Sequence, residues 1–377
     1  TMAVGPMPTP ALAHLTKSFN ASCGIMITAS HNPADDNGIK IFDADGFKLP
    51  DAIEAQIEEY VFRGNVPNPD GVADPIGRAY RIDDARGRYI EFAKASVRNR
   101  SLRGLKLVLD CANGAAYSMA PLIFRELGAE VITTGISPNG LNINANCGAM
   151  HPEAIREAVL SNKADAGITL DGDADRVIFL DATGQVVNGD RILGMCALDM
   201  HRRKRLEKDT LVLTSMSNLG LHKAMEEAGI RTVTTDVGDR YVIENMRENG
   251  YNLGGEQSGH IIFMDYVTTG DGIITALHVL KQMQNYGKSL AELADCMQEY
   301  PQRLESVRIK EKIPFEEMPA LQQVISRCQE SLGKRGRTVV RYSGTENKIR
   351  VLLEAETVEQ VNSWTEQILA VIRKELI

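Results

Sequence analysis

The sequence predicts a multi-domain α/β protein, and three observations support this prediction. The chain has 377 residues, which is more than one hydrophobic core usually serves. A succession of strand, helix, glycine and strand begins at Leu105 and begins again at Thr210. Such βαβ units predict parallel strands joined by right-handed crossovers. After residue 303 the pattern changes to two strands around a glycine turn, so we expect three similar α/β domains followed by a smaller α+β domain.

The first elements expected are a helix that Pro10 opens and that reaches Phe19, and a strand at Cys23–Ile27. They resemble the end of a third copy of the repeat. The residues before them contain no basic segment leading into an apolar signal core. A sheet whose first strand arrives in this way is expected to lack upstream elements. The sequence therefore predicts an N-terminally truncated chain.

The two complete copies of the repeat end their helices in the same way. In the first copy, LKLVLD is a strand, residues 117–127 form a helix, Gly128 stops it, and AEVITT is the next strand. In the second, TLVLTS is a strand, LGLHKAMEEA a helix, Gly229 the stop, and IRTVTTDV a strand. Glycine ends a helix readily because it adopts the left-handed conformation without strain.

The C-terminal part predicts a strand at SVRIK, a helix over residues 314–333 and two strands within RTVVRYSGTENKIRVLLEAE. The last helix carries an apolar stripe at helical spacing, which we interpret as core packing. The predicted domains cover residues 1–99, 100–196, 197–302 and 303–377.

Composition excludes several classes of protein. Hydrophobic residues make up 43% of the chain and charged residues 24%, as is usual for globular proteins. The net charge of -8 argues against a general nucleic-acid binder. No apolar run is long enough to span a membrane. Six scattered cysteines without a CxxC pair favour reduced thiols, so we expect a cytoplasmic protein with neither nucleic acid nor membrane as partner.

The stretch ITASHNPADDNGIK is the first candidate site. It places Ser30, His31 and Lys40 around turn signals, directly after an apolar strand. In open α/β sheets, ligands bind at the ends of strands, so the loop is expected to bind one. No GxSxG elbow surrounds Ser30, which disfavours a serine hydrolase.

The stretch GITLDGDADRVIFLD is the second candidate. Asp171, Asp173 and Asp175 lie at alternate positions between two predicted strands. Their mutual repulsion predicts a hard divalent cation with oxygen ligands, and the absence of His or Cys disfavours zinc. An EF-hand would need Gly and Glu where Arg176 and Ala182 stand. The alternative is a solvated acidic turn, which the preceding buried strand disfavours.

The stretch LGGEQSGHIIF is the third candidate. Glu256, Ser258 and His260 are spaced by two, so they can face one ligand, and the hydroxyls of a sugar would suit them. Taken alone, the pattern favours a plain glycine-rich turn over a sugar site.

The stretch RYSGTENKIR is the fourth candidate. Arg341, Ser343, Thr345 and Arg350 surround Gly344. Backbone N–H groups in such a turn bind anions, and arginine pairs bidentately with phosphate. The alternative is a β-hairpin turn with solvated charges.

The four loops TASHNP, DGDADR, GEQSGH and RYSGTE, in this order, resemble the α-D-phosphohexomutase family over essentially the whole chain. GEQSGH and DVGDRYV (Asp236–Val242) resemble its phosphoglucosamine branch, whereas phosphomannomutase/phosphoglucomutase members more often have Met at Gln257. Two departures stand out. Tyr342 and Asn347 replace prolines that many members have, and no upstream GTDG-type motif is present.

The resemblance implies roles for the residues of the four loops. Ser30 becomes the phosphoserine, and one Mg²⁺ is held by its phosphate and by Asp171, Asp173 and Asp175. His31 and Lys40 then move protons, while Arg176 orients the transferring phosphate. The sugar and its second phosphate are expected to contact Asp239, Arg240, Glu256, Ser258, His260, Arg341, Ser343, Gly344, Thr345 and Arg350.

The implied reaction converts glucosamine 6-phosphate into glucosamine 1-phosphate through a 1,6-bisphosphate, for UDP-N-acetylglucosamine and peptidoglycan precursors. A trace of glucosamine or glucose 1,6-bisphosphate is the expected activator. Two alternatives stay open: the same chemistry on mannose or glucose phosphates, and a fragment that binds metal and sugar phosphate without turnover. The expected partner is a small-molecule sugar phosphate, and the oligomeric state is left open, a homodimer included.

Overall fold

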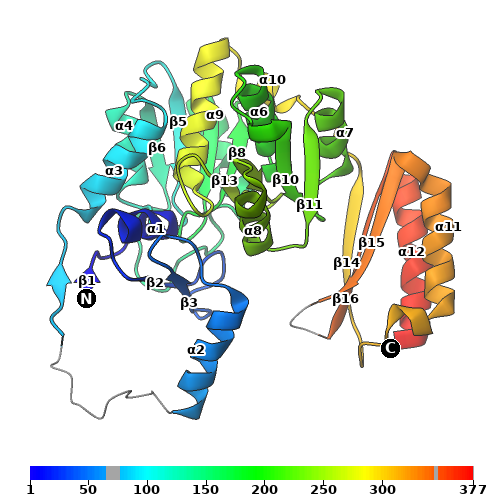
Figure 1. The fold of residues 1–377 in the computed structure, drawn as a ribbon. Coiled ribbons are helices and arrows are strands. Elements are labelled where there is room, and N and C mark those ends of the chain that lie inside the picture. Colours follow the sequence, from blue (N-terminus) through cyan, green and yellow to red (C-terminus); the bar gives the residue numbers. More distant parts are fainter. Residues whose placement is uncertain (65–76, 344–346, 377) are drawn as a thin grey trace.

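A computed structural model describes residues 1–64, 77–343 and 347–376 (Figure 1). The strands form four main sheets and one short parallel pair, β1 with β4. Each of the first three candidate loops closes an antiparallel hairpin, and this arrangement positions the site.

The N-terminal region contains the hairpin that carries Ser30. Strands β2 and β3 pair antiparallel with Thr28 opposite Gly38, so the loop 29–37 closes this hairpin. The predicted first helix and strand are confirmed to within a residue. The elements are β1 (Met2–Ala3), α1 (Thr9–Ser18), β2 (Gly24–Thr28), β3 (Gly38–Phe42), α2 (Asp51–Arg63), β4 (Tyr80–Arg81) and α3 (Ala85–Ser96).

The second region contains a five-stranded sheet in the order β6-β5-β7-β8-β9. Strands β7 and β8 pair antiparallel, with Leu170 opposite Val177, so the acidic loop closes this hairpin. The predicted helix over residues 117–127 is wrong in its start, because turns occupy the residues before Ala120 and Pro121 suits a first helical turn. The elements are β5 (Lys106–Asp110), α4 (Ala120–Glu126), β6 (Glu130–Thr134), η1 (Pro152–Ile155), α5 (Arg156–Asn162), β7 (Ala166–Leu170), β8 (Val177–Asp181) and β9 (Val186–Val187).

The third region repeats this topology. Its sheet has the order β11-β10-β12-β13, with two parallel pairs followed by one antiparallel pair, as in β6-β5-β7-β8. The predicted repeat is therefore confirmed, and the loop 256–260 occupies the place of the acidic loop. The elements are α6 (Gly189–Arg202), η2 (Glu207–Asp209), β10 (Thr210–Thr214), α7 (Leu219–Glu227), β11 (Arg231–Thr235), α8 (Asp239–Asn249), β12 (Leu253–Gly255), β13 (Ile261–Phe263), α9 (Gly272–Tyr286) and α10 (Leu290–Ala294).

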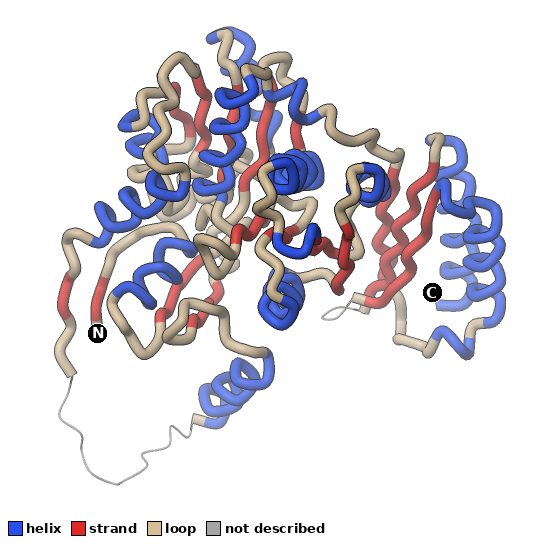
Figure 2. Tube along the Cα trace, turned by 45° about the horizontal axis from the view of Figure 1, so that its top comes forward, coloured by secondary structure: helices blue, strands red, loops and turns tan. Residues whose placement is uncertain are grey.

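The C-terminal unit is an antiparallel sheet in the order β14-β16-β15. Its helices cover the sheet face turned away from the rest of the molecule (Figures 1 and 2). The predicted strand SVRIK is misplaced, because the ladder with β16 already begins at Gln302 and ends at Arg308. The predicted helix over 314–333 starts only at Pro319, after one 3-10 turn. The elements are β14 (Gln302–Arg308), η3 (Phe315–Glu317), α11 (Pro319–Leu332), η4 (Gly333–Arg335), β15 (Gly336–Tyr342), β16 (Lys348–Ala355) and α12 (Val358–Leu376).

Two main hydrophobic cores support these regions. The larger runs through the first three regions, from Met7 to Met297, and the other lies wholly within the C-terminal unit. All six cysteines are free thiols. Among the helices that the structure describes, none combines the length and the hydrophobicity of a membrane span.

Candidate active site

Ser30 lies just beyond the end of β2, in a tight turn of its own loop. Its φ of 52° falls in the left-handed region, which is uncommon for residues other than glycine. The Ser30 backbone N–H donates to Thr28 Oγ1 at 2.8 Å, and Ser30 Oγ lies 3.4 Å from His31 Nδ1. The turn therefore presents the hydroxyl next to the imidazole of the following residue.

The three aspartates of the acidic loop are buried together. Asp171, Asp173 and Asp175 are at most 3% exposed, and one oxygen from each lies within 4.8 Å of the others. Each also has a buried carboxylate oxygen without a hydrogen-bond partner among the described residues. Burial and then the neighbouring carboxylates raise the pKa of Asp171 well above its usual range. This donor set fits a hard divalent cation, which would supply the missing positive charge.

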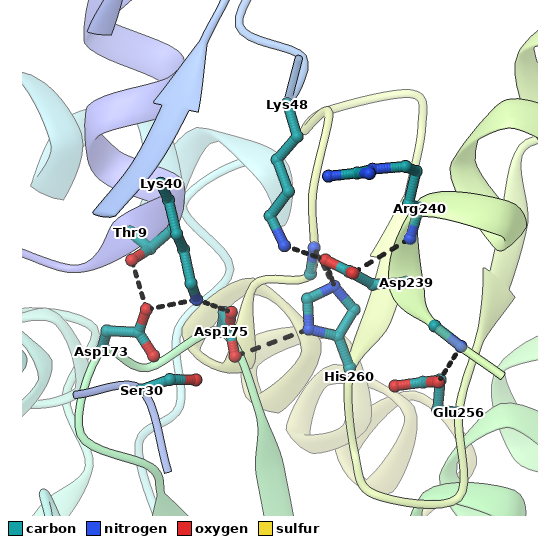
Figure 3. A network of polar contacts seen from close by, with 12 residues as sticks. Thr9, Ser30, Lys40, Lys48, Asp173, Asp175, Asp239, Arg240, Glu256 and His260 are labelled. Carbon is teal, nitrogen blue, oxygen red and sulfur yellow. Dashed lines mark hydrogen bonds and ion pairs between the residues drawn. The ribbon is translucent and has the colours of Figure 1, made fainter. Parts of the chain in front are cut away.

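Lys40 reaches the same carboxylates from β3 (Figure 3). Its Nζ donates to Asp173 Oδ2 at 2.7 Å and to Asp175 Oδ2 at 2.8 Å. Burial alone would lower the pKa of Lys40, but the two carboxylates outweigh it and raise the pKa above its ordinary value. Thr9, at the start of α1, donates a further hydrogen bond from Oγ1 to Asp173 Oδ2. The Ser30 hairpin and α1 are thus fixed to the acidic loop.

Arg176 and His31 complete this part of the site. The Arg176 backbone N–H donates to Asp171 Oδ1 at 3.0 Å, and its guanidinium Nε lies 3.9 Å from Asp175 Oδ1. Burial, followed by the charge of Arg176, lowers the pKa of His31, although Asp175 and Asp173 oppose the shift. The lowered pKa favours the neutral imidazole of His31, which is the form able to accept a proton.

His260 lies behind the acidic loop. Its Nε2 accepts the backbone N–H of Gly270 at 2.9 Å, so Nδ1 carries the proton and points at Asp175 Oδ1, 3.5 Å away. A Cβ at Gly270 would lie 2.6 Å from the ring, which explains the glycine. Sequence reasoning placed His260 at the sugar; in the structure it is only 2% exposed and supports Asp175.

Asp239 and Arg240 connect the third region to the N-terminal one. Asp239 forms an ion pair with Lys48 (Figure 3). Arg240 pairs with Asp51 and with Glu54, the latter at 2.7 Å. Burial would raise the pKa of Asp239, but Lys48 and then His260 outweigh it and lower it. Sequence reasoning found Asp239 and Arg240 but missed their partners Lys48, Asp51 and Glu54. Nothing in the local sequence marks a residue whose partner lies almost two hundred positions away.

The loop 256–260 faces the loop before α8. The Gly238 backbone N–H donates to Glu256 Oε1 at 3.2 Å, and the Ser258 hydroxyl lies 3.4 Å from Glu256 Oε2. Gln257 points the other way, because its Nε2 donates to Asp190 Oδ2 at 3.0 Å. Ser258 is exposed and Glu256 is half-buried, and neither is turned toward Asp190 as Gln257 is, so these two side chains are the candidates of this loop for contact with a ligand.

Arg341 and Arg350 stand opposite each other on β15 and β16. Among the described residues, neither guanidinium Nε has a hydrogen-bond partner, although both atoms are buried. Burial and then the charge of Arg350 lower the pKa of Arg341, and Asp236 of the loop before α8 opposes this shift. Two adjacent cations of this kind attract an anion such as phosphate. Ser343 is buried beside them, while the predicted Gly344 and Thr345 lie outside the described residues.

Comparison with protein families covers most of the chain. Models described as phosphoglucomutase/phosphomannomutase alpha/beta/alpha domains I, II and III match residues 1–66, 87–184 and 188–300, and the model of the C-terminal domain matches 304–371. This chain belongs to the phosphoglucomutase/phosphomannomutase family. The predicted phosphohexomutase architecture is thereby confirmed, while the predicted domain boundaries stay predictions.

Individual members of the family are similar to this chain over nearly its whole length. The phosphoglucosamine mutase of Geotalea daltonii is 52% identical over 374 residues, which are 99% of this chain and 82% of that protein. The phosphoglucosamine mutase of Pelobacter propionicus is 53% identical over 374 residues, 99% of this chain and 83% of that protein. The predicted enzyme class, an intramolecular phosphotransferase of the isomerase type, is confirmed by this membership.

Solved structures share the fold. A phosphoglucomutase/phosphomannomutase family protein from Burkholderia thailandensis superposes with a TM-score of 0.77 at 21% identity, covering 99% of this chain and 82% of that one. The N-acetylphosphoglucosamine mutase of Aspergillus fumigatus, solved with GlcNAc-6P and magnesium, gives a TM-score of 0.74 at 22% identity, covering 97% and 92%.

Proposed function

We propose that the chain is a phosphoglucosamine mutase that interconverts glucosamine 6-phosphate and glucosamine 1-phosphate through a phosphoserine and a 1,6-bisphosphate. The observation that carries the proposal is the convergence of Ser30, a neutral His31 and the Lys40-bound acidic triad. The names of relatives at 52% and 53% identity support the choice of sugar.

In the proposed first step, the sugar O1 hydroxyl attacks the phosphorus carried by Ser30 Oγ. A phosphorus–O1 bond forms and the phosphorus–Oγ bond breaks. The O1 hydroxyl of the sugar loses one proton, and Ser30 Oγ gains one. His31 suits this proton transfer, because it is neutral and its Nδ1 lies 3.4 Å from Ser30 Oγ. The bisphosphate then reorients in the site, and Ser30 Oγ takes the phosphate from O6. Ser30 loses one proton in this step and O6 gains one.

Positioning and charge supply most of the rate of such a transfer. Asp171, Asp173 and Asp175 would hold Mg²⁺ together with the Ser30 phosphate, and the ion would neutralise charge on the transferring group. Lys40 stays charged beside two of these carboxylates and adds positive charge there. Its predicted part in proton transfer stays a prediction, as does the orienting role of Arg176.

In the proposal, the sugar and its second phosphate bind to the other two loops, GEQSGH and RYSGTE. We assign the sugar hydroxyls to Glu256 and Ser258, and the phosphate that is not reacting to Arg341 and Arg350. Because an unphosphorylated Ser30 has no group to transfer, a trace of glucosamine or glucose 1,6-bisphosphate is proposed as the activator. The homodimer and the cytoplasmic location stay predictions.

The test compares turnover of glucosamine 6-phosphate, glucose 6-phosphate and mannose 6-phosphate, each with Mg²⁺ and a trace of glucose 1,6-bisphosphate. We expect the glucosamine substrate to give the highest kcat/KM. The variant Ser30→Ala is the control and should show almost no turnover and no phosphate by intact mass. A preference for mannose or glucose would favour the related activity, and calorimetric binding without product would favour a binding protein.

A further inference from the structure

We propose that Asn144 is a positioning residue that fixes the Ser30 loop against the acidic loop for both phosphoryl transfers. The proposal rests on the proposed function of Ser30. Asn144 lies between β6 and η1, in a segment that none of the four sequence motifs includes. It does not contact the reacting oxygen, so it acts through the backbone of the loop.

The side-chain amide of Asn144 holds two carbonyl groups of the Ser30 loop. Its Nδ2 donates to the carbonyl oxygen of Ser30 at 2.8 Å and to that of Asn32 at 2.8 Å. The two hydrogens of one NH₂ group therefore bind the carbonyl groups of the two residues that flank His31 in the chain. This geometry uses the full donor capacity of the amide.

Among the described residues, the other hydrogen bonds of this turn are local to the loop. The Ser30 N–H donates to Thr28 Oγ1, and the Asn32 N–H donates to the Ala29 carbonyl at 2.9 Å. Such bonds shape the turn but do not place it relative to a neighbouring region. Asn144 does so across 114 positions of sequence to Ser30.

Asn144 also lies directly on the acidic loop. A Cβ added to Gly172 would sit 2.5 Å from the Ser30 carbonyl oxygen and 2.8 Å from Asn144 Nδ2. The glycine therefore allows three groups to meet without a spacer: the Ser30 carbonyl, the Asn144 amide and the backbone between Asp171 and Asp173. A shift of the Ser30 loop would change the distance from Ser30 to the carboxylates.

Asn144 is itself held firmly. Its φ is 57°, a conformation that asparagine tolerates better than most residues, and its N–H donates to the Ala112 carbonyl at 2.9 Å. Asn144 is 8% exposed, and its Oδ1 is buried without a hydrogen-bond partner among the described residues. A buried unpaired oxygen costs stability, so the contribution of this side chain lies in its NH₂ group.

The experiment compares changes at Asn144 with identical changes at Asn146. Asn146 lies two residues away, is exposed, and has a φ of 52°, so alanine meets the same left-handed conformation at both positions. We would measure kcat and KM for glucosamine 6-phosphate in Asn144→Ala and Asn146→Ala. Hydrogen exchange of the peptide covering residues 29–37 would be followed in both.

We expect Asn144→Ala to lower kcat by roughly 10- to 100-fold, the scale of loss that a small misplacement of reacting groups produces. KM should stay within about twofold, because Asn144 does not bind the sugar. The 29–37 peptide should exchange faster. Asn146→Ala should match the wild type in all three measurements.

Asn144→Asp keeps the shape of the side chain but replaces the donor with an acceptor, so it should lose at least as much kcat, while Asn146→Asp should lose none. This pair decides the question if Asn144→Ala fails to fold. Equal kcat and equal exchange at the two positions would overturn the proposal, as would a loss confined to KM. If the wild type showed no mutase turnover but the exchange contrast held, the positioning role would stand and the proposed function would fail.

Discussion

At the scale of single residues, the site is a balance of buried charges. Three carboxylates at most 3% exposed lie together, the ammonium of Lys40 contacts two of them, and each carboxylate still keeps an oxygen without a hydrogen-bond partner among the described residues. The raised pKa of Asp171, which follows from burial and the neighbouring carboxylates, indicates that one lysine does not offset them all. The side chains at this point are therefore able to hold a cation.

Asp173→Asn tests the cation site. Asparagine keeps the size and one oxygen but removes a charge, so Mg²⁺ affinity measured by calorimetry should fall by at least about tenfold. Asp45→Asn, which removes one charge from an exposed position, is the control and should leave the affinity unchanged. Unchanged affinity in Asp173→Asn would refute the three-carboxylate site.

Arg341→Ala tests the arginine pair. A charge-assisted bond to phosphate contributes about 1.5–3 kcal/mol, so KM for glucosamine 6-phosphate should rise by roughly one to two orders of magnitude. In the proposed role the arginine binds the phosphate equally in the ground state and the transition state, so kcat should change little. Arg341→Lys should recover part of the affinity, since lysine lacks the planar fork. Arg327→Ala, on the exposed surface of α11, is the control. A loss confined to kcat would remove this pair from the phosphate site.

At the scale of helices and strands, the sequence could predict the elements whose pattern is local. The acidic loop was found because apolar runs bracket it, and both strands, β7 and β8, are buried along their whole length. The start of β14 was missed because its residues alternate between exposed and half-buried, which hides the strand among polar residues. The sequence did not reveal the roles of Thr9, Lys48 and Asn144. Each contacts a partner more than a hundred positions away, and the periodicity of the local sequence contains no information on such a contact.

Helix α6 carries an acid whose burial gives a prediction on pH. Asp190 is fully buried, accepts hydrogen bonds from the Asn218 N–H and from Gln257, and burial raises its pKa from 3.8 to about 6. The folded state therefore binds this proton more tightly than the unfolded state. Its contribution to stability is fully present below pH 3.8 and is lost as the pH rises through about 6.

Asp190→Asn should remove this dependence. The quantity to compare is the free energy of unfolding of the variant minus that of the wild type. This difference should increase by on the order of 3 kcal/mol between pH 4 and pH 7, at about 1.36 kcal/mol per pKa unit. Denaturant titrations at several pH values would measure the difference, and other acids with raised pKa values cancel because both proteins carry them. A constant difference across this range would contradict the assignment.

At the scale of the whole molecule, the C-terminal unit meets the third region at a contact, here called the seat, whose described residues include Ser217, Asn218, Tyr300, Arg337 and Glu354. It has its own core, and its linker meets the loop before α7. Asn218 accepts the Tyr300 N–H at 3.0 Å and donates to the Tyr300 carbonyl at 3.0 Å. Arg337 pairs with the fully buried Glu354 and donates to the Ser217 carbonyl. The position of Arg341 and Arg350 relative to the acidic loop therefore depends on the contacts of this seat.

Arg337→Met tests the seat. The change leaves the Glu354 carboxylate buried and unpaired, which typically costs about 3–5 kcal/mol. We expect the C-terminal unit to unfold in a separate, earlier thermal transition, and the linker at residues 298–302 to be cleaved faster by protease. Arg335→Met is the matched control, because Arg335 is exposed and pairs only with Glu356 among the described residues, at 3.6 Å. A single, unshifted transition would show that the seat does not hold the unit.

The same seat constrains how this chain can evolve. Gly220, at the start of α7, lies so close to the linker that any Cβ there would collide with the carbonyl oxygen of Gln298. Every substitution at this position must therefore displace the backbone of Gln298, which lies in the segment leading to the C-terminal unit. In a library of random variants, position 220 should tolerate few substitutions, and a natural lineage should change it together with the linker it faces.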